Sequence, residues 1–166
     1  PAALINDEKA TAIIQHITYN VLDECYGTEV FTDPTIKGRL GINAMKAKKH
    51  LYDHVVFDST NERDFATELD INTDVAVYVK LPDGFYISTP VGHYNPDWAI
   101  AFNKGTVKHI FFVAETKGTM DSLNLKPIEQ AKIACAKKLF SNLSSADVVY
   151  HEVNSYQHLL DIMDKL

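Results

Sequence analysis

Two acidic side chains and a lysine at the ends of neighbouring apolar segments are the residues best suited to chemistry in this chain. Asp97 stands directly before the apolar segment 98–102, and Glu115 and Lys117 close the apolar segment 107–114. Two carboxylates and an ammonium at one edge of a sheet can bind a divalent cation and assist phosphodiester cleavage. The spacing predicts a metal-dependent site formed by Asp97, Glu115 and Lys117.

A β-hairpin is needed to bring these residues together. Both segments are apolar at nearly every position, as in strands buried on both faces, and residues 103–105 read as a turn between them. Such a hairpin brings Asp97 level with the end of the second strand. Alternation places Glu115 and Lys117 on one face and Thr116 on the other, so a bulge could be needed to align the two acids.

Parts of this pattern also occur elsewhere in the sequence. The Pro-Asp pair in 82–84 is followed by glycine and reads as a turn, and the acid-x-Lys of 7–9 opens a helical pattern. The competing interpretation is that Asp97 caps a turn and that Glu115 and Lys117 form an ordinary ion pair. An uncompensated carboxylate at the end of so apolar a segment is costly, and a divalent ion would offset that cost. The metal site is therefore the favoured interpretation.

The three residues belong to a longer series of motifs, and this series resembles the PD-(D/E)xK nuclease superfamily. More narrowly, it is similar to the endonuclease domain of type III restriction enzymes over roughly residues 53–156. The matching segments are Lys80-Leu81-Pro82-Asp83, Thr89-Pro90-Val91-Gly92, Tyr94-Asn95-Pro96-Asp97-Trp98-Ala99-Ile100, Val113-Ala114-Glu115-Thr116-Lys117-Gly118, and Glu129 with Lys132-Ile133-Ala134-Cys135-Ala136. The resemblance implies cleavage of double-stranded DNA that leaves a 5′-phosphate and a 3′-hydroxyl.

The chemistry expected at the site follows from the oxygen ligands. Asp97 and Glu115 are the predicted ligands of Mg²⁺, with Mn²⁺ as a substitute, because hard divalent ions prefer carboxylate oxygen. Thr116 could add its backbone carbonyl to the metal. Lys117 is expected to position or deprotonate the attacking water and to stabilise charge on the phosphorane. Asp97, Glu115 and Lys117 are thus the predicted catalytic residues.

Five further residues lie near these motifs, and two interpretations stay open for each. Glu62 is a candidate third metal ligand, because family members place a glutamate on the helix before the first strand, but it also fits a Ser-x-x-Glu capping box. Gln130 and Lys132 could contact a DNA phosphate or form a solvated helix face. His93 and Tyr94, in a predicted loop, could face DNA or pack within a turn.

The order of predicted elements indicates an α/β protein with a restriction-endonuclease-like mixed β-sheet flanked by helices. We expect an N-terminal helical extension or connector over residues 1–52 and the nuclease domain over residues 53–166. The predicted helices cover about 7–26, 45–49, 59–70, 127–139 and 155–166, and the predicted strands cover 54–57, 75–81, 85–87, 98–102, 107–117 and 148–150.

Composition and charge restrict the class of protein. The chain has 166 residues, which suits one domain, and a formal net charge of −6, which is awkward for a DNA-binding protein because phosphate contacts need basic groups. We therefore expect neighbouring domains to deliver the DNA. No apolar stretch reaches the length of a membrane span and no signal peptide is visible, so a cytoplasmic location is expected. The resemblance implies that the cytoplasm is prokaryotic. Cys25 and Cys135 are expected to be free thiols.

The resemblance also implies partners. A first residue other than Met is expected of a fragment or a processed chain, and the full subunit of the family carries a helicase-like motor. This sequence has no Gly-x-x-x-x-Gly-Lys-Ser/Thr loop, so ATP would act only through a motor domain absent from this chain. A methyltransferase subunit is the other expected partner. The alternatives are a stand-alone repair or junction-resolving nuclease of the same fold and a non-catalytic docking module that kept the fold.

Overall fold

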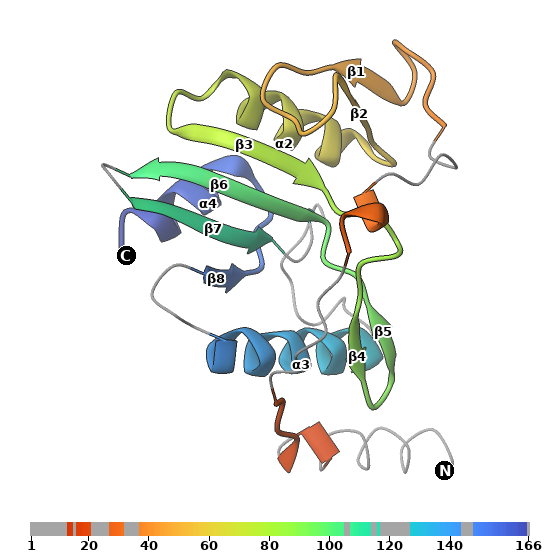
Figure 1. Cartoon of the computed structure of the whole chain (residues 1–166), viewed down its shortest axis with the longest axis vertical. Helices are drawn as coiled ribbons and strands as arrows, with labels where there is room; N and C mark the ends of the chain where they lie inside the picture. Colours follow the sequence, from red (N-terminus) through yellow and green to blue (C-terminus); the bar gives the residue numbers. More distant parts are fainter. Residues whose placement is uncertain are drawn as a thin grey trace.

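A four-stranded mixed β-sheet forms the centre of the computed structural model (Figure 1). Its order is β3-β6-β7-β8; β3 and β7 run antiparallel to β6, and β8 runs parallel to β7. The bounds of these strands are Val75–Lys80 for β3, Trp98–Lys104 for β6, Val107–Val113 for β7 and Val148–His151 for β8. The structure describes residues 13–14, 16–20, 27–31, 37–104, 107–113, 116, 127–143 and 148–165.

The register of the sheet brings several strand ends to one edge. Lys80 pairs with Trp98, Trp98 with Val113, and Val113 with His151, so these four residues form one row across the sheet. β3, β7 and β8 end at this row and β6 begins there. The predicted hairpin of β6 and β7 is confirmed, and the edge next to Asp97 is where polar residues that follow these strands can gather.

Helices α2 and α4 cover one face of the sheet (Figure 1). α2 spans Thr60–Ile71 and α4 spans Tyr156–Met163. Each begins at a serine, Ser59 or Ser155, whose hydroxyl accepts a hydrogen bond from the backbone N–H three residues later, and this satisfies one of the unpaired donors of the first turn. The shared core contains Ala47, Val55, Phe65, Ala66, Leu69, Val75, Tyr78, Trp98, Ile100, Phe102, Val153, Tyr156 and Leu159.

Helix α3 packs with a small hairpin at the other end of the molecule (Figure 1). α3 spans Pro127–Leu143, and the hairpin consists of β4, Ile87–Thr89, and β5, Gly92–Tyr94. Gly92 has φ +111°, a conformation that side-chain-bearing residues rarely adopt. A second core joins them and contains Ile87, Tyr94, Ile133, Ala136, Phe140 and Tyr150.

Of two helices predicted near the N-terminus, the one over 45–49 is wrong and the one over 7–26 is helical at residues 13, 14 and 16 but not at 17–20. Residues 45–49 are not a helix, because β1, Ala44–Lys46, pairs with β2, His54–Val56. The backbone N–H groups of Lys48 and Lys49 donate to Asp70 Oδ1 instead of to a helical turn. The strand predicted at 54–57 is confirmed.

The long helix predicted over residues 7–26 is interrupted, because residues 17–20 are not helical. Tyr19 packs against the second core and donates its hydroxyl hydrogen to the carbonyl of Ser88 at 3.1 Å. β-Branched and aromatic residues have low helix propensity, so this tertiary contact decides the local conformation. The rest of this prediction lies largely outside the described residues. A 3₁₀ helix at Thr28–Phe31 interrupts the predicted connector.

Two predicted buried faces also differ from the structure. The alternation of Val75, Val77 and Val79 in the sequence predicts that they share one buried face, but the register of β3 shifts between Val75 and Val77, which leaves Val77 40% exposed while Tyr78 is buried. The helical pattern of α3 predicts a buried stripe that includes Ile128, but Ile128 is exposed. The buried residues of α3 are Ile133, Cys135, Ala136 and Phe140.

The prediction of an α/β protein with a mixed sheet flanked by helices is confirmed. Cys135 is a buried free thiol, and Cys25 lies outside the described residues. Among the described helices, none has the length and apolar character needed to cross a membrane. The division at residue 52 stays a prediction, although Ala47 and Val55 belong to one core.

Candidate active site

Asp97 lies against the segment that carries the other predicted catalytic residues. Its carboxylate oxygen Oδ2 accepts a hydrogen bond from the backbone N–H of Thr116 at 3.0 Å. Its backbone carbonyl accepts one from Leu81 N at 2.8 Å, which fixes Asp97 beside the end of β3. Thr116 stands between Glu115 and Lys117 in the sequence, and both neighbours lie outside the described residues. The predicted proximity of Asp97 and this tripeptide is therefore seen at Thr116.

Glu62 makes both the capping contact and a further ion pair. The Ser59 hydroxyl accepts a hydrogen bond from Glu62 N at 3.2 Å, and Glu62 Oε2 accepts one from the Asp58 N–H at 2.8 Å. This arrangement resembles a capping box, except that the carboxylate binds the residue before the N-cap. Glu62 Oε2 also lies 2.6 Å from Lys80 Nζ. The cap interpretation of Glu62 is confirmed in this modified form, and a metal contact stays a prediction.

Lys80 joins two acids at the end of β3. Its Nζ lies 2.6 Å from Asp58 Oδ2 and 2.6 Å from Glu62 Oε2. Burial by itself would lower the pKa of Lys80, but its hydrogen bonds to Asp58 and Glu62 and the charges of both acids raise the pKa above its ordinary value. Lys80 is therefore charged at neutral pH.

Glu62 and Asp97 approach the same strand end from different elements. The side chain of Lys80 contacts Glu62 on α2, and the next residue, Leu81, contacts the backbone of Asp97. The helix acid and the hairpin acid thus contact two consecutive residues, the last residue of β3 and the one that follows it. Lys80 belongs to a motif that the sequence already suggested, but its two acidic partners are 18 and 22 residues away and could not be identified from spacing.

The predicted DNA contacts are distributed differently from the expectation. Tyr94 is not in a loop: it lies on β5, is buried, and its hydroxyl is 2.9 Å from the Tyr150 hydroxyl, so it cannot face DNA in this structure. His93 is also on β5 but is exposed and stacks on Tyr86, with ring centroids 3.8 Å apart. Gln130 is exposed and Lys132 is half-buried on α3.

The donor atoms near Asp97 suit a hard cation. The Thr116 hydroxyl oxygen is buried and has no hydrogen-bond partner among the described residues. The Asp97 carboxylate, which can coordinate a metal, accepts a hydrogen bond from the backbone N–H of Thr116. Within the described ranges, no three His, Cys, Asp or Glu side chains gather as a metal site, and Glu115 lies outside those ranges. The oxygen donors of Asp97 and Thr116 therefore suit a hard cation such as Mg²⁺.

Two histidines border this edge of the sheet and predict an effect of pH on stability. His50 Nε2 accepts a hydrogen bond from Lys80 N at 3.2 Å, and burial lowers the pKa of His50, against the opposing effects of the Tyr52 carbonyl and Asp70. Burial also lowers the pKa of His151, helped by Lys137 and His158 and opposed by Glu152.

Because both pKa values are lower in the folded state, the unfolded chain takes up protons first on acidification. The stability contributed by the neutral histidines is complete above the ordinary pKa of 6.5 and is lost as the pH falls through the folded values. Urea unfolding at about pH 7.5 and about pH 5 should show a loss of stability that is smaller in His50→Gln and His151→Gln. An equal loss in wild type and both variants would show that these histidines do not carry the effect.

Comparisons with known proteins agree with this architecture. Residues 48–156 match a family model described as an endonuclease domain. The chain is 29% identical over 121 residues to the type III restriction-modification enzyme EcoPI Res subunit of Escherichia phage P1, covering 69% of this chain and 12% of that protein. It is 31% identical over 100 residues to the EcoP15I Res subunit of Escherichia coli, covering 58% of this chain and 10% of that protein. The chain thus spans about a tenth of the length of these relatives. No solved structure matches it significantly.

Proposed function

The chain belongs to the endonuclease-domain family, and from that premise we propose that it is the Mg²⁺-dependent nuclease domain of a type III restriction enzyme. Its substrate is double-stranded DNA, whose phosphodiester bonds it hydrolyses. The observation that carries the proposal is the hydrogen bond from Thr116 N to Asp97 Oδ2. Adjacent Cα atoms are about 3.8 Å apart, so chain connectivity keeps Glu115 and Lys117 near Thr116. This supports the predicted convergence of two acids and a lysine.

The residues of the site have distinct roles in the proposed reaction. The carboxylates of Asp97 and Glu115 bind the cation, with the backbone carbonyl of Thr116 as a further oxygen donor and Glu62 as the third acid. A bound Mg²⁺ would polarise the scissile phosphate and acidify the attacking water. Lys117 positions that water, or takes its proton, and stabilises the negative charge that develops on the phosphorus centre.

The acidic charge of the chain bears on how DNA reaches the site. A net charge of −6 gives little non-specific affinity for phosphates, so DNA delivery depends on other parts of the assembly. In the type III system these are a helicase-like motor, which would use ATP, and a methyltransferase subunit, in a prokaryotic cytoplasm. On this chain, exposed His93 and Gln130 and half-buried Lys132 are the proposed DNA contacts.

Conservative substitutions in the tripeptide test the proposal in the full-length protein. Glu115→Gln removes one charge from the cation site, and Lys117→Ala removes the group that acts on the water. Each should reduce Mg²⁺-dependent cleavage of double-stranded DNA by about a hundredfold or more, because each removes a group that stabilises the transition state. Cleavage is measured on plasmid DNA with EDTA as the metal-free control. Full activity of either variant would refute its assignment, and a wild-type protein that binds its partners without cutting would indicate a docking module.

A further inference from the structure

We propose that Lys80 is a positioning residue of the metal site: it holds the Glu62 carboxylate by one oxygen and directs the other oxygen toward the cation. The inference rests on the proposed function and assigns a role to a lysine that the catalytic motif does not include. Lys80 acts through Glu62 and contacts neither the substrate nor the reacting atoms.

The contacts of the Glu62 carboxylate are one-sided. Within the described part of the chain, Oε2 accepts the hydrogen bond of the Asp58 N–H at 2.8 Å and pairs with Lys80 Nζ at 2.6 Å. The Asp58 N–H and the Lys80 ammonium together hold the plane of the Glu62 carboxylate more firmly than either donor would alone. Oε1 then has a defined direction and remains available to a cation.

Burial distinguishes the two acids that Lys80 contacts. The side chains of Lys80 and Glu62 are 19% and 14% exposed, whereas that of Asp58 is 79% exposed. An ion pair with a solvated acid is screened by water and contributes little to stability. Breaking an ion pair between two largely buried groups is costly, because it leaves a buried charge without a partner. The functional partner of Lys80 is therefore Glu62.

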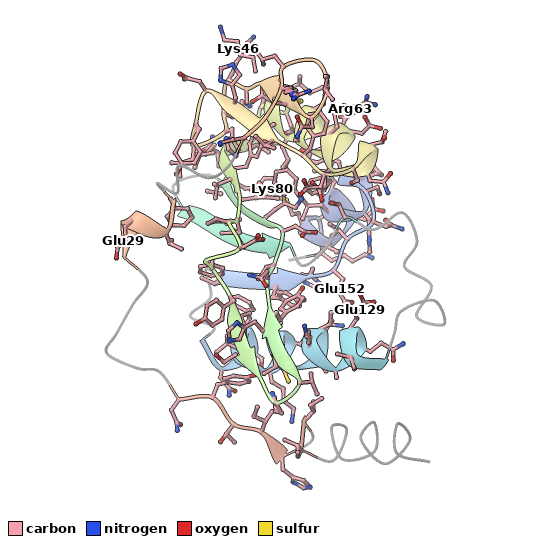
Figure 2. The ribbon with its side chains drawn as sticks, turned by 90° about the vertical axis from the view of Figure 1, so that its right-hand side faces the viewer. Glu29, Lys46, Arg63, Lys80, Glu129 and Glu152 are labelled. Atoms are coloured by element: carbon pink, nitrogen blue, oxygen red, sulfur yellow. The ribbon has the colours of Figure 1, made fainter. Side chains whose placement is uncertain are left out.

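Location links this pair to the site. Lys80 is the last residue of β3, and Leu81 beside it donates to the carbonyl of Asp97 at 2.8 Å. A cavity of about 340 Å³ borders the end of β3, where its lining includes Asp58, Lys80 and Leu81. Lys80 is half-buried, whereas Lys46 is exposed and projects from the top of the molecule in Figure 2.

Two effects of Lys80 on a cation oppose each other. Its ammonium repels the cation, but it also keeps Glu62 ionised and correctly oriented. The Asp58 carboxylate already offsets part of the positive charge of Lys80, which weakens the repulsion of the cation. After loss of Lys80, the Glu62 carboxylate would keep one of its two donors, the backbone N–H of Asp58. On this proposal orientation outweighs repulsion, as for outer-shell partners of metal ligands generally, whose loss weakens metal binding by about 10–100-fold.

The test measures Mn²⁺ binding by calorimetry in the full-length protein, together with the Mg²⁺ dependence of cleavage and the melting temperature. Lys80→Met should weaken Mn²⁺ binding about tenfold, and Lys80→Arg, which keeps the charge, should restore most of it. Lys46→Met is the matched control, because Lys46 is exposed on β1, and it should change none of the three quantities. Glu62→Gln and the double variant Lys80→Met/Glu62→Gln complete a double-mutant cycle. The double variant leaves no unpaired charge among the largely buried groups, because the remaining acid, Asp58, is 79% exposed and solvated. It therefore keeps the test valid if Lys80→Met alone fails to fold.

If Lys80 acts through Glu62, the double variant binds Mn²⁺ as Glu62→Gln does. Unchanged or tighter Mn²⁺ binding by Lys80→Met, or a double variant weaker than Glu62→Gln, would overturn the inference while the proposed function stands. A wild-type protein with no metal-dependent cleavage would instead overturn the proposed function, and the inference with it.

Discussion

Replacing Asp97 with asparagine should reduce cleavage of double-stranded DNA by at least about a thousandfold while the fold is retained. A carboxylate that binds the cation supports several kcal/mol of transition-state stabilisation, and each 1.4 kcal/mol is about tenfold in rate. Asparagine has the same shape, and its side-chain oxygen can still accept the hydrogen bond from Thr116 N that Asp97 Oδ2 accepts at 3.0 Å. The variant therefore removes charge at the site with little change of structure. Initial cleavage rates in Mg²⁺ measure the effect, and melting temperature confirms folding.

Asp83→Asn is the matched control for this experiment. Asp83 also follows a proline, but it lies exposed in a turn closed by the hydrogen bond from Phe85 N to the Pro82 carbonyl at 2.8 Å. The Asp83→Asn variant should cleave DNA at the wild-type rate. Equal rates for Asp97→Asn and wild type would remove Asp97 from the catalytic residues. In the intact enzyme, ATP hydrolysis by the proposed motor should be unaffected by either change.

Replacing Trp98 with alanine should destabilise the fold by about 3–5 kcal/mol, the usual cost of deleting a large buried aromatic side chain. Trp98 is fully buried, with its ring centroid 5.7 Å from that of Phe65 and 6.1 Å from that of Tyr78. It thus joins α2, β3 and β6 directly beside Asp97. Chemical unfolding in urea measures the loss, and cleavage should fall with it because the start of β6 positions Asp97.

Two further variants make this prediction specific. Trp98→Phe should cost much less, because the buried indole N–H has no hydrogen-bond partner in the structure and none is lost. Val77→Ala, on the neighbouring strand but 40% exposed, should cost less than about 1 kcal/mol. Equal losses in Val77→Ala and Trp98→Ala would contradict the assignment of Trp98 to the centre of the core.

The parts of the fold that could be predicted from sequence depend on local rules. Two apolar segments joined by a short polar turn predict the hairpin of β6 and β7. A serine before a helical pattern predicts where α2 and α4 begin. A proline at the first position marked α3. In each case the residues that decide the structure are close in the sequence, so periodicity and capping preferences are sufficient.

The errors arose where distant contacts decide local structure. Residues 45–49 have good helix formers, yet pairing with β2 and the Asp70 carboxylate determine their conformation. The register shift after Val75 changed which side of β3 is buried, and no local pattern indicates such a bulge. The same change places Tyr78 and Lys80 toward α2, where Lys80 meets Glu62.

The candidate site was only partly accessible from sequence for the same reason. Asp97 and Thr116 could be paired because a hairpin links them, and the structure brings them together. The pair of Glu62 and Lys80 depends on how a helix packs on a sheet, so spacing alone left Glu62 between two interpretations. Tyr94 was misassigned because a three-residue strand is too short for a recognisable alternation.

The most direct test of the metal site is the anomalous diffraction of Mn²⁺ in crystals of the protein. We expect one strong peak in contact with the carboxylates of Asp97 and Glu115, at about 2.0–2.2 Å, and its loss in Asp97→Asn. Carboxylates of Asp97 and Glu115 that point to opposite faces of the sheet, with no peak between them, would contradict the account.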